Sequence, residues 1–170
     1  MDRHTRRRRS LAAVAALMVA SALLAACSSS SSSGTTSTTS APGSPSLCTL
    51  LSPAEVTAVT GATVGTPRTV HQGSVTDCTH ASADPSEAVL IRYTTHATAA
   101  SFAIEQHGYE QLGHSVTPVT GLGDEAFSFS ETVGATTKNT VVARNDTLQV
   151  VVTGSATPAQ IESLARQALA

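Results

Sequence analysis

Four side chains of metal-binding type lie close together near the middle of the chain: Glu105, His107, Glu110 and His114. Zinc accepts carboxylate oxygens and imidazole nitrogens as ligands, and residues four apart share one face of a helix. Gly108, however, is expected to end the helix that would hold them, so the spacing loses its geometric meaning. A solvated loop is the simpler interpretation. The sequence therefore predicts no metal and no cofactor, with a zinc site as the alternative.

The residues around Cys78 are the second set that could do chemistry. Asp77 and His80 flank this cysteine and could orient one another, but on a strand these two positions point to opposite faces. Familiar catalytic motifs are missing from the sequence: it has no Gly-x-Ser-x-Gly and no His-Glu-x-x-His, and Ala135 stands where a Ser-x-x-Lys motif ending at Lys138 needs serine. We expect no catalytic residues and no enzymatic activity, with a hydrolase of non-standard site as the alternative.

A glycine-rich segment, Gly121 to Glu125, is the third set. Backbone N–H groups of such a segment can bind phosphate, but Asp124 and Glu125 would repel the anion. The pattern predicts a tight turn that leads into a strand at Ala126. A carboxylate-lined contact with a ligand or cation is the alternative, and the sequence assigns no ligand-binding residue.

One of the three cysteines, Cys27, has a different expected role from the other two. Cys27 follows an apolar segment, which leaves Cys48 and Cys78 as an even number. Disulfides are typical of exported proteins in oxidising compartments. Redox-active pairs usually have Cys-x-x-Cys spacing, whereas these two cysteines are 30 residues apart. We predict a structural Cys48–Cys78 bridge that joins the first helix to the sheet and stabilises the domain by about 3 to 4 kcal/mol.

The N-terminus predicts export. An arginine-rich start precedes a mostly apolar segment, 11–26, which is typical of a secretory signal and is shorter than the ~20 residues of a membrane span. Residues 24–27, Leu-Ala-Ala-Cys, resemble the bacterial lipobox, in which the cysteine thiol receives a diacylglyceryl group. We expect a signal peptide over 1–26, lipid on Cys27, and a protein anchored on the outer face of the cytoplasmic membrane. A soluble secreted protein with an incidental Cys27 is the alternative.

Composition limits what the rest of the chain can be. Residues 27–46 are the cysteine and a Ser/Thr-rich tether without core-forming side chains, which predicts a flexible segment. The remaining residues, 47–170, are enough for one domain with a core. Without the signal the net charge is −6, so attachment to an anionic membrane must come from the lipid. The acidic charge and the scarcity of aromatic residues argue against a nucleic-acid partner.

Helix signals occur at three places. Residues 52–55, Ser-Pro-Ala-Glu, form a capping box with proline at the first helical position, and Gly61 follows as a C-cap. A weaker helix is expected over 98–107, burying Ala99, Phe102 and Ala103. A Thr-Pro-Ala-Gln segment at 157–160 begins a third helix, whose apolar face at helical spacing consists of Ile161, Leu164, Ala165 and Ala168.

Alternating apolar residues predict strands between these helices. The clearest are 89–93 and the hairpin formed by 141–144 and 148–153, around an Asn-Asp pair that suits a tight turn. Weaker strands are expected at 63–71, 75–80, 115–119 and 126–130. This order of elements predicts an α+β domain, an antiparallel sheet with helices packed on one face. The matching Ser/Thr-Pro-Ala helix starts suggest two related halves.

Taken in order, these motifs resemble a family of exported actinobacterial lipoproteins of unassigned function. The similarity rests on Cys27 and its tether, on Cys48 with the following Thr-Leu-Leu-Ser-Pro-Ala-Glu-Val, on Cys78, and on Gly-Leu-Gly-Asp-Glu-Ala at 121–126. Family members often have an aromatic residue at the position of His80. The resemblance implies an extracytoplasmic domain and provides no catalytic residues. We expect a non-catalytic accessory module that binds a small or amphipathic ligand between sheet and helices; a module that docks an envelope protein is the alternative.

Overall fold

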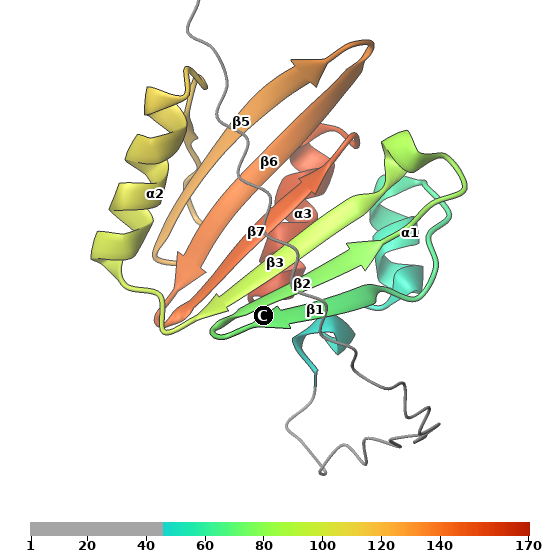
Figure 1. Ribbon diagram of the computed structural model, residues 1–170, viewed down its shortest axis with the longest axis horizontal. Coiled ribbons are helices and arrows are strands. Elements are labelled where there is room, and N and C mark those ends of the chain that lie inside the picture. Colours follow the sequence, from blue (N-terminus) through green and yellow to red (C-terminus); the bar gives the residue numbers. More distant parts are fainter. Residues whose placement is uncertain (1–45) are drawn as a thin grey trace, which may run out of the picture. The chain divides into compact units, whose positions relative to one another are not determined.

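The computed structural model describes residues 46–170, which form one seven-stranded antiparallel sheet with three α-helices (Figure 1). The predicted signal peptide, Cys27 and the tether up to residue 45 lie outside the described residues. The strands are β1 (Arg68–Gln72), β2 (Val75–His80), β3 (Val89–Thr95), β4 (Thr117–Pro118), β5 (Glu125–Val133), β6 (Thr136–Asn145) and β7 (Leu148–Gly154). The α-helices are α1 (Pro53–Thr60), α2 (Ala99–Gln111) and α3 (Pro158–Ala168), and two short 3₁₀ helices are η1 (Leu47–Thr49) and η2 (Pro85–Glu87).

The strand order is β1-β2-β3-β7-β6-β5-β4, and every neighbouring pair is antiparallel. Two three-stranded meanders, β1–β3 and β5–β7, therefore meet where β3 pairs with β7. This arrangement confirms the predicted α+β class. The suggestion of two related halves stays a prediction, since α1 precedes its meander whereas α3 follows its own. Each weak strand lies at its predicted place, but all except β2 have different bounds: β1 occupies only the second part of 63–71 and extends to Gln72, β4 covers two residues of 115–119, and β5 continues to Val133.

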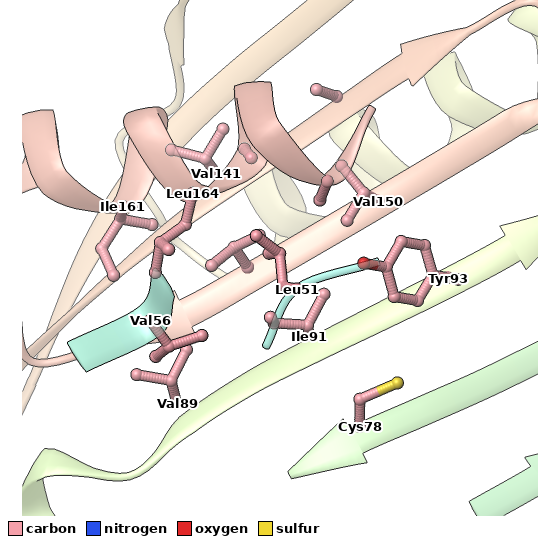
Figure 2. Close-up of a cluster of buried hydrophobic side chains, with 14 of the residues drawn as sticks. Leu51, Val56, Cys78, Val89, Ile91, Tyr93, Val141, Val150, Ile161 and Leu164 are labelled. Atoms are coloured by element: carbon pink, nitrogen blue, oxygen red, sulfur yellow. The ribbon is translucent and has the colours of Figure 1, made fainter. Parts of the chain in front are cut away.

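The main core lies on one side of the sheet, which we name the core face. Alternate strand residues such as Ile91, Val141 and Val150 point to this side and pack against α1 and α3 (Figure 2). Ile161 and Leu164 of α3 are fully buried there, together with the predicted partners Ala165 and Ala168. Burial of such a side chain contributes about 1.5 to 3 kcal/mol. The apolar face of α3 predicted from the sequence therefore forms the centre of the main core.

The opposite side of the sheet, which we name the second face, carries α2. Phe102 of this helix packs with Phe127, Val142 and Val151 in a separate buried cluster. The expectation of helices on one face thus holds for α1 and α3 but is wrong for α2. The reason is visible in β6 and β7, where Val141-Val142-Ala143 and Val150-Val151-Val152 are apolar at consecutive positions. Consecutive apolar residues on a strand require cover on both faces.

The helix ends follow local chemistry. Ser52 and Glu55 form the predicted capping box of α1, and the Gly61 C-cap is in the left-handed conformation. Thr157 and Gln160 form the corresponding box at α3. The prediction for α2 was wrong at its C-terminus, because the helix continues through Gly108 to Gln111. Glycine weakens a helix by about 1 kcal/mol without preventing it, and here tertiary packing of α2 offsets that cost.

Candidate functional site

The largest hollow described on the second face lies beside α2. It is lined by Glu105, Gly108, Tyr109 and Leu112, has a volume of about 510 Å³, and is open to solvent. Its lining is mostly apolar apart from the Glu105 carboxylate. Sequence reasoning missed this site, although a glycine inside a helical pattern is a signal for a packing or functional role.

Aromatic side chains fix α2 to the sheet. The Phe102 ring meets Phe127 edge-on with 5.2 Å between ring centroids, and the Tyr109 ring lies 4.4 Å from that of Phe129. His114, just after the helix, adds a ring 4.6 Å from Phe129. Such pairs contribute about 0.5 to 1.5 kcal/mol beyond their buried area. The lining of the hollow therefore belongs to a positioned helix.

Polar groups hold the side of α2 that faces the middle strands. Gln149 Nε2 of β7 donates a hydrogen bond of 2.6 Å to the Glu105 carboxylate. Burial raises the pKa of Tyr109; the Glu105 charge raises it further, and the Arg92 charge opposes this. Glu105, Tyr109 and Arg92 are therefore close enough for their charges to interact. The hollow thus lies on the side of α2 that contacts β7 through Glu105 and Gln149.

The second face of β1, β2 and β3 has no helix over it among the described residues, and Figure 1 looks onto this side. Arg92 and Asp77, paired across β3 and β2, form a two-pronged ion pair of 2.7 and 3.1 Å. The hydrogen bonds from Arg92 hold the pKa of Asp77 below its usual value. A charged pair therefore lies on this uncovered face of the sheet.

Two large apolar side chains on α2 and just after it are strongly exposed. Ile104 is 74% exposed and Leu112 is 76% exposed. With Gly108 between them at helical spacing, they form an apolar stripe along one side of the helix. Exposed apolar patches of this kind often mark binding surfaces.

The predicted turn at Gly121–Glu125 is present, and its carboxylates are tied to Arg144 of β6. Arg144 Nε donates to Glu125 at 3.0 Å, and its Nη1 lies 3.4 Å from Asp124. Asp124 also accepts a hydrogen bond of 2.8 Å from the Asp146 backbone N–H. The acidic residues thus lock the loop to the β6–β7 hairpin. A second open hollow of about 420 Å³ lies between this loop and α2.

The four residues of metal-binding type do not form one cluster. Glu105 is engaged by Gln149, and His114 stacks on the aromatic rings of the second face. His107 and Glu110 lie 3.5 Å apart on the exposed side of α2. Residues 46–170 contain no group of three or more His, Cys, Asp or Glu side chains that could hold a metal ion. The absence of a metal in the protein stays a prediction.

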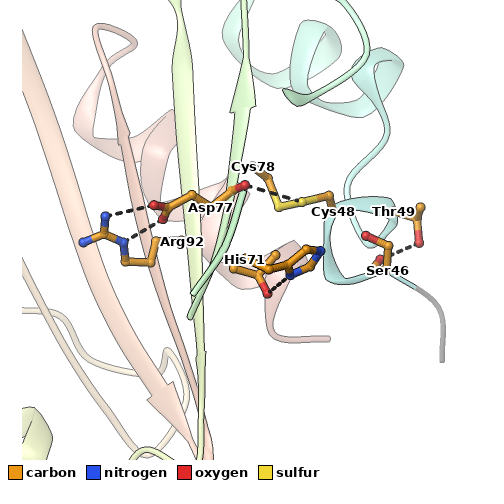
Figure 3. Close-up of a disulfide and its surroundings, with 8 residues drawn as sticks. Ser46, Cys48, Thr49, His71, Asp77, Cys78 and Arg92 are labelled. Carbon is orange, nitrogen blue, oxygen red and sulfur yellow. Dashed lines mark hydrogen bonds and ion pairs between the residues drawn. A yellow bond between two sulfur atoms is a disulfide. The ribbon is translucent and has the colours of Figure 1, made fainter. Parts of the chain in front are cut away.

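The Cys48–Cys78 disulfide is confirmed, and it joins η1 to β2 with 5.4 Å between the Cα atoms. Figure 3 shows the Asp77 side chain pointing from β2 toward Arg92, while Cys78 points to the other side. His80 lies on the same face as Cys78 and is fully buried. Asp77 and His80 therefore cannot orient one another, as expected from strand alternation.

His80 is a polar side chain that is fully buried in the core. Among the described residues neither ring nitrogen forms a hydrogen bond, although the Gly65 backbone lies close enough to influence the ring. Burial lowers the pKa of His80 below 6.5, and the backbone of Gly65 offsets this only in part. The folded protein therefore holds His80 in its neutral form.

This burial predicts a loss of stability in mild acid. Below about pH 6.5 the unfolded chain protonates His80 whereas the folded chain resists it, so the free energy of unfolding falls by up to about 1.4 kcal/mol per pH unit. Urea unfolding between about pH 7 and about pH 5 measures this slope, in a window above the titration of the carboxylates. His80→Phe should flatten it, and His71→Gln, which changes an exposed histidine, should not. An unchanged slope in the His80→Phe variant would contradict the assignment.

The fold and the hollow define a class: an antiparallel α+β domain with a shallow, wide-open and mostly apolar hollow along one helix. The chain matches no protein-family model, no curated protein and no solved structure. Among the described residues, 46–170, no helix has the length and apolarity needed to cross a membrane.

Proposed function

We propose that this protein is a membrane-anchored, extracytoplasmic binding module that holds an amphipathic ligand in the hollow beside α2. The observation that carries the proposal is the hollow itself, which is apolar, open and built on a helix that aromatic contacts hold in place. Ligand sites in proteins are concave and mostly apolar, with a few polar groups that fix orientation.

The chemistry around the hollow favours a ligand with an apolar part and a polar head. Tyr109 and Leu112 offer apolar surface, and Glu105 supplies a carboxylate at the same place. The Arg92–Asp77 pair lies on the uncovered part of the second face. These carboxylates already have partners, Gln149 and Arg92. Such pairing supports binding rather than catalysis.

Gly108 provides the space. An added Cβ at this position would meet no atom within 4 Å. An alanine at this mid-helix position would make the helix more stable by up to about 1 kcal/mol. The glycine therefore lowers the stability of the helix and leaves space on its surface. This combination supports a binding role for the surface at that position.

Filling the hollow should weaken binding without harming the fold. Gly108→Leu is expected to weaken binding of the uncharged fluorescent probe N-phenyl-1-naphthylamine roughly tenfold, or about 1.4 kcal/mol, because the new side chain occupies the space. Gly108→Ala is the matched control: it gives a similar gain in helix propensity but should bind like the wild type. Fluorescence titration measures both. Equal affinity in the Gly108→Leu variant would show that the probe binds elsewhere.

Docking of an envelope protein is the second candidate function, and the exposed Ile104 and Leu112 favour it. A protein partner would contact Ile104, which belongs to the exposed stripe but does not line the hollow. Ile104→Lys would then abolish the interaction and leave probe binding in the hollow unchanged. This variant therefore separates the two candidates.

The proposed anchor is lipid on Cys27, because the acidic domain would be repelled by anionic lipid. Each buried CH₂ contributes about 0.8 kcal/mol, so two acyl chains should hold the protein firmly where one would not. Cys27→Ser removes the acceptor thiol and should abolish incorporation of radiolabelled palmitate, leaving uncleaved precursor or protein released into the medium. Ser33→Ala, a change in the tether, should label normally. Unlabelled wild-type protein found entirely in the medium would refute the anchor.

A further inference from the structure

The two edges of the sheet differ in how they are protected against pairing with another strand. At one edge β4 has only two residues, Thr117 and Pro118, and proline has no N–H to donate. The part of β5 beyond β4 is centred on Glu131, so antiparallel self-pairing there would place two carboxylates opposite each other. Like charges in directly opposed positions are destabilising. Self-pairing centred on this part of β5 is therefore disfavoured.

The other edge, β1, has none of these features. All five of its residues, Arg68 to Gln72, are exposed, and the register with β2 runs without a bulge. Among residues 46–170 no further strand pairs with β1. Its centre, Val70, is a β-branched residue that is 39% exposed. A free, regular edge of this type is a template for strand addition.

We propose that β1 pairs with β1 of a second copy of this chain, antiparallel and centred on Val70. This register places Arg68 opposite Gln72 of the other copy and Thr69 opposite His71. The only fully charged residue of the strand, Arg68, therefore never faces its own kind. Val70 meets Val70, a pair of β-branched side chains that stabilises antiparallel sheets.

The pairing joins the two sheets into one. A two-fold axis perpendicular to the sheet keeps the second face of both copies on the same side, because Val70, Asp77 and Arg92 lie in one cross-strand row of that face. The uncovered strands β1, β2 and β3 of both copies then form one continuous surface of six strands, roughly 29 Å wide at about 4.8 Å per strand. An α2 helix with its hollow lies on each side of this surface. The dimer goes beyond the proposed ligand binding and does not depend on it, since association is measured without ligand.

Cross-linking tests the register directly. In the full exported chain, Val70→Cys treated with a short bis-maleimide should give a product of doubled mass, whereas Val133→Cys, at another exposed valine, and the wild type should not. The disulfide-bonded cysteines do not react, and the wild type controls for Cys27. Equal yields from Val70→Cys and Val133→Cys would overturn the proposal. So would a cross-link in intact cells that joins position 70 mainly to a different protein.

Sedimentation tests the energetics. Val70→Lys places like charges opposite each other at the centre of the pair and should raise the dimer dissociation constant roughly tenfold. Val133→Lys makes the same chemical change at the opposite edge of the sheet, away from β1, and should sediment like the wild type. Circular dichroism and melting temperature establish that both variants are folded. If the Val70→Lys variant sediments like the wild type, the β1 pairing is wrong.

Discussion

Reduction of the Cys48–Cys78 disulfide is expected to lower the melting temperature by roughly 12 to 16 °C. The bridge closes a loop between residues 30 positions apart, and the chain-entropy model gives about 3 to 4 kcal/mol for such a loop. For a domain of about 124 residues each kcal/mol corresponds to about 4 °C. The bridge also fixes the segment that contains Leu51, a core residue that is only 2% exposed.

Thermal unfolding with and without reductant, followed by circular dichroism, measures this effect. The double variant Cys48→Ala, Cys78→Ala is the control, because it should start from the lower melting temperature and not respond to reductant. Hydrogen exchange at residues 47–52 should accelerate in both cases, since η1 contacts the sheet at β2. A wild-type melting temperature that is unchanged when thiol labelling shows full reduction would contradict the structural role.

Replacement of Gly123 by alanine is expected to destabilise the domain by about 2 to 5 kcal/mol. Gly123 has a positive φ of 60°, and a Cβ there would overlap the carbonyl oxygen of Arg144. The left-handed conformation costs an alanine about 1 to 2 kcal/mol, and overpacking adds about 1 to 3 kcal/mol. Because the obstacle is backbone, it cannot rotate away. The loop would then lose the 2.8 Å hydrogen bond from the Asp124 N–H to Arg144.

Gly121, two residues earlier, is a matched control. It also has a positive φ, 72°, but an added Cβ would meet nothing within 4 Å. Gly121→Ala should therefore cost only the conformational term, about 1 to 2 kcal/mol. Urea unfolding of the two variants separates strain from collision. Equal losses in both variants would show that the contact with Arg144 contributes nothing.

The Gly121–Glu125 segment shows how far the residues alone could be interpreted. Glycine spacing and adjacent acids predicted a turn rather than a phosphate site, because both features act within five residues. The partner of those acids, Arg144, is about 20 residues away, and no local pattern connects it to them. The turn was predictable from the sequence, whereas its attachment to β6 was not.

The candidate site was hidden for a related reason. Gly108 was interpreted as a helix stop, since its intrinsic propensity is low. The contacts that carry the helix past it, among them Glu105 with Gln149, 44 residues away, exist only in the folded chain. Gly108, Tyr109 and Leu112 thus become one surface only when α2 is docked on the sheet.

Local sequence patterns were enough to predict the positions of the strands, the capped helices α1 and α3, the disulfide and the α+β class. Each of these depends on residues within about four positions, on alternation, or on the number of cysteines. Tertiary structure decided which face α2 covers, the hollow beside it, and the free edge at β1. The face was decided by Phe102 packing against β5, β6 and β7, and the free edge by the absence of a further paired strand among residues 46–170. These outcomes depend on which distant surfaces gain most from mutual burial, a comparison of whole arrangements that no local pattern contains.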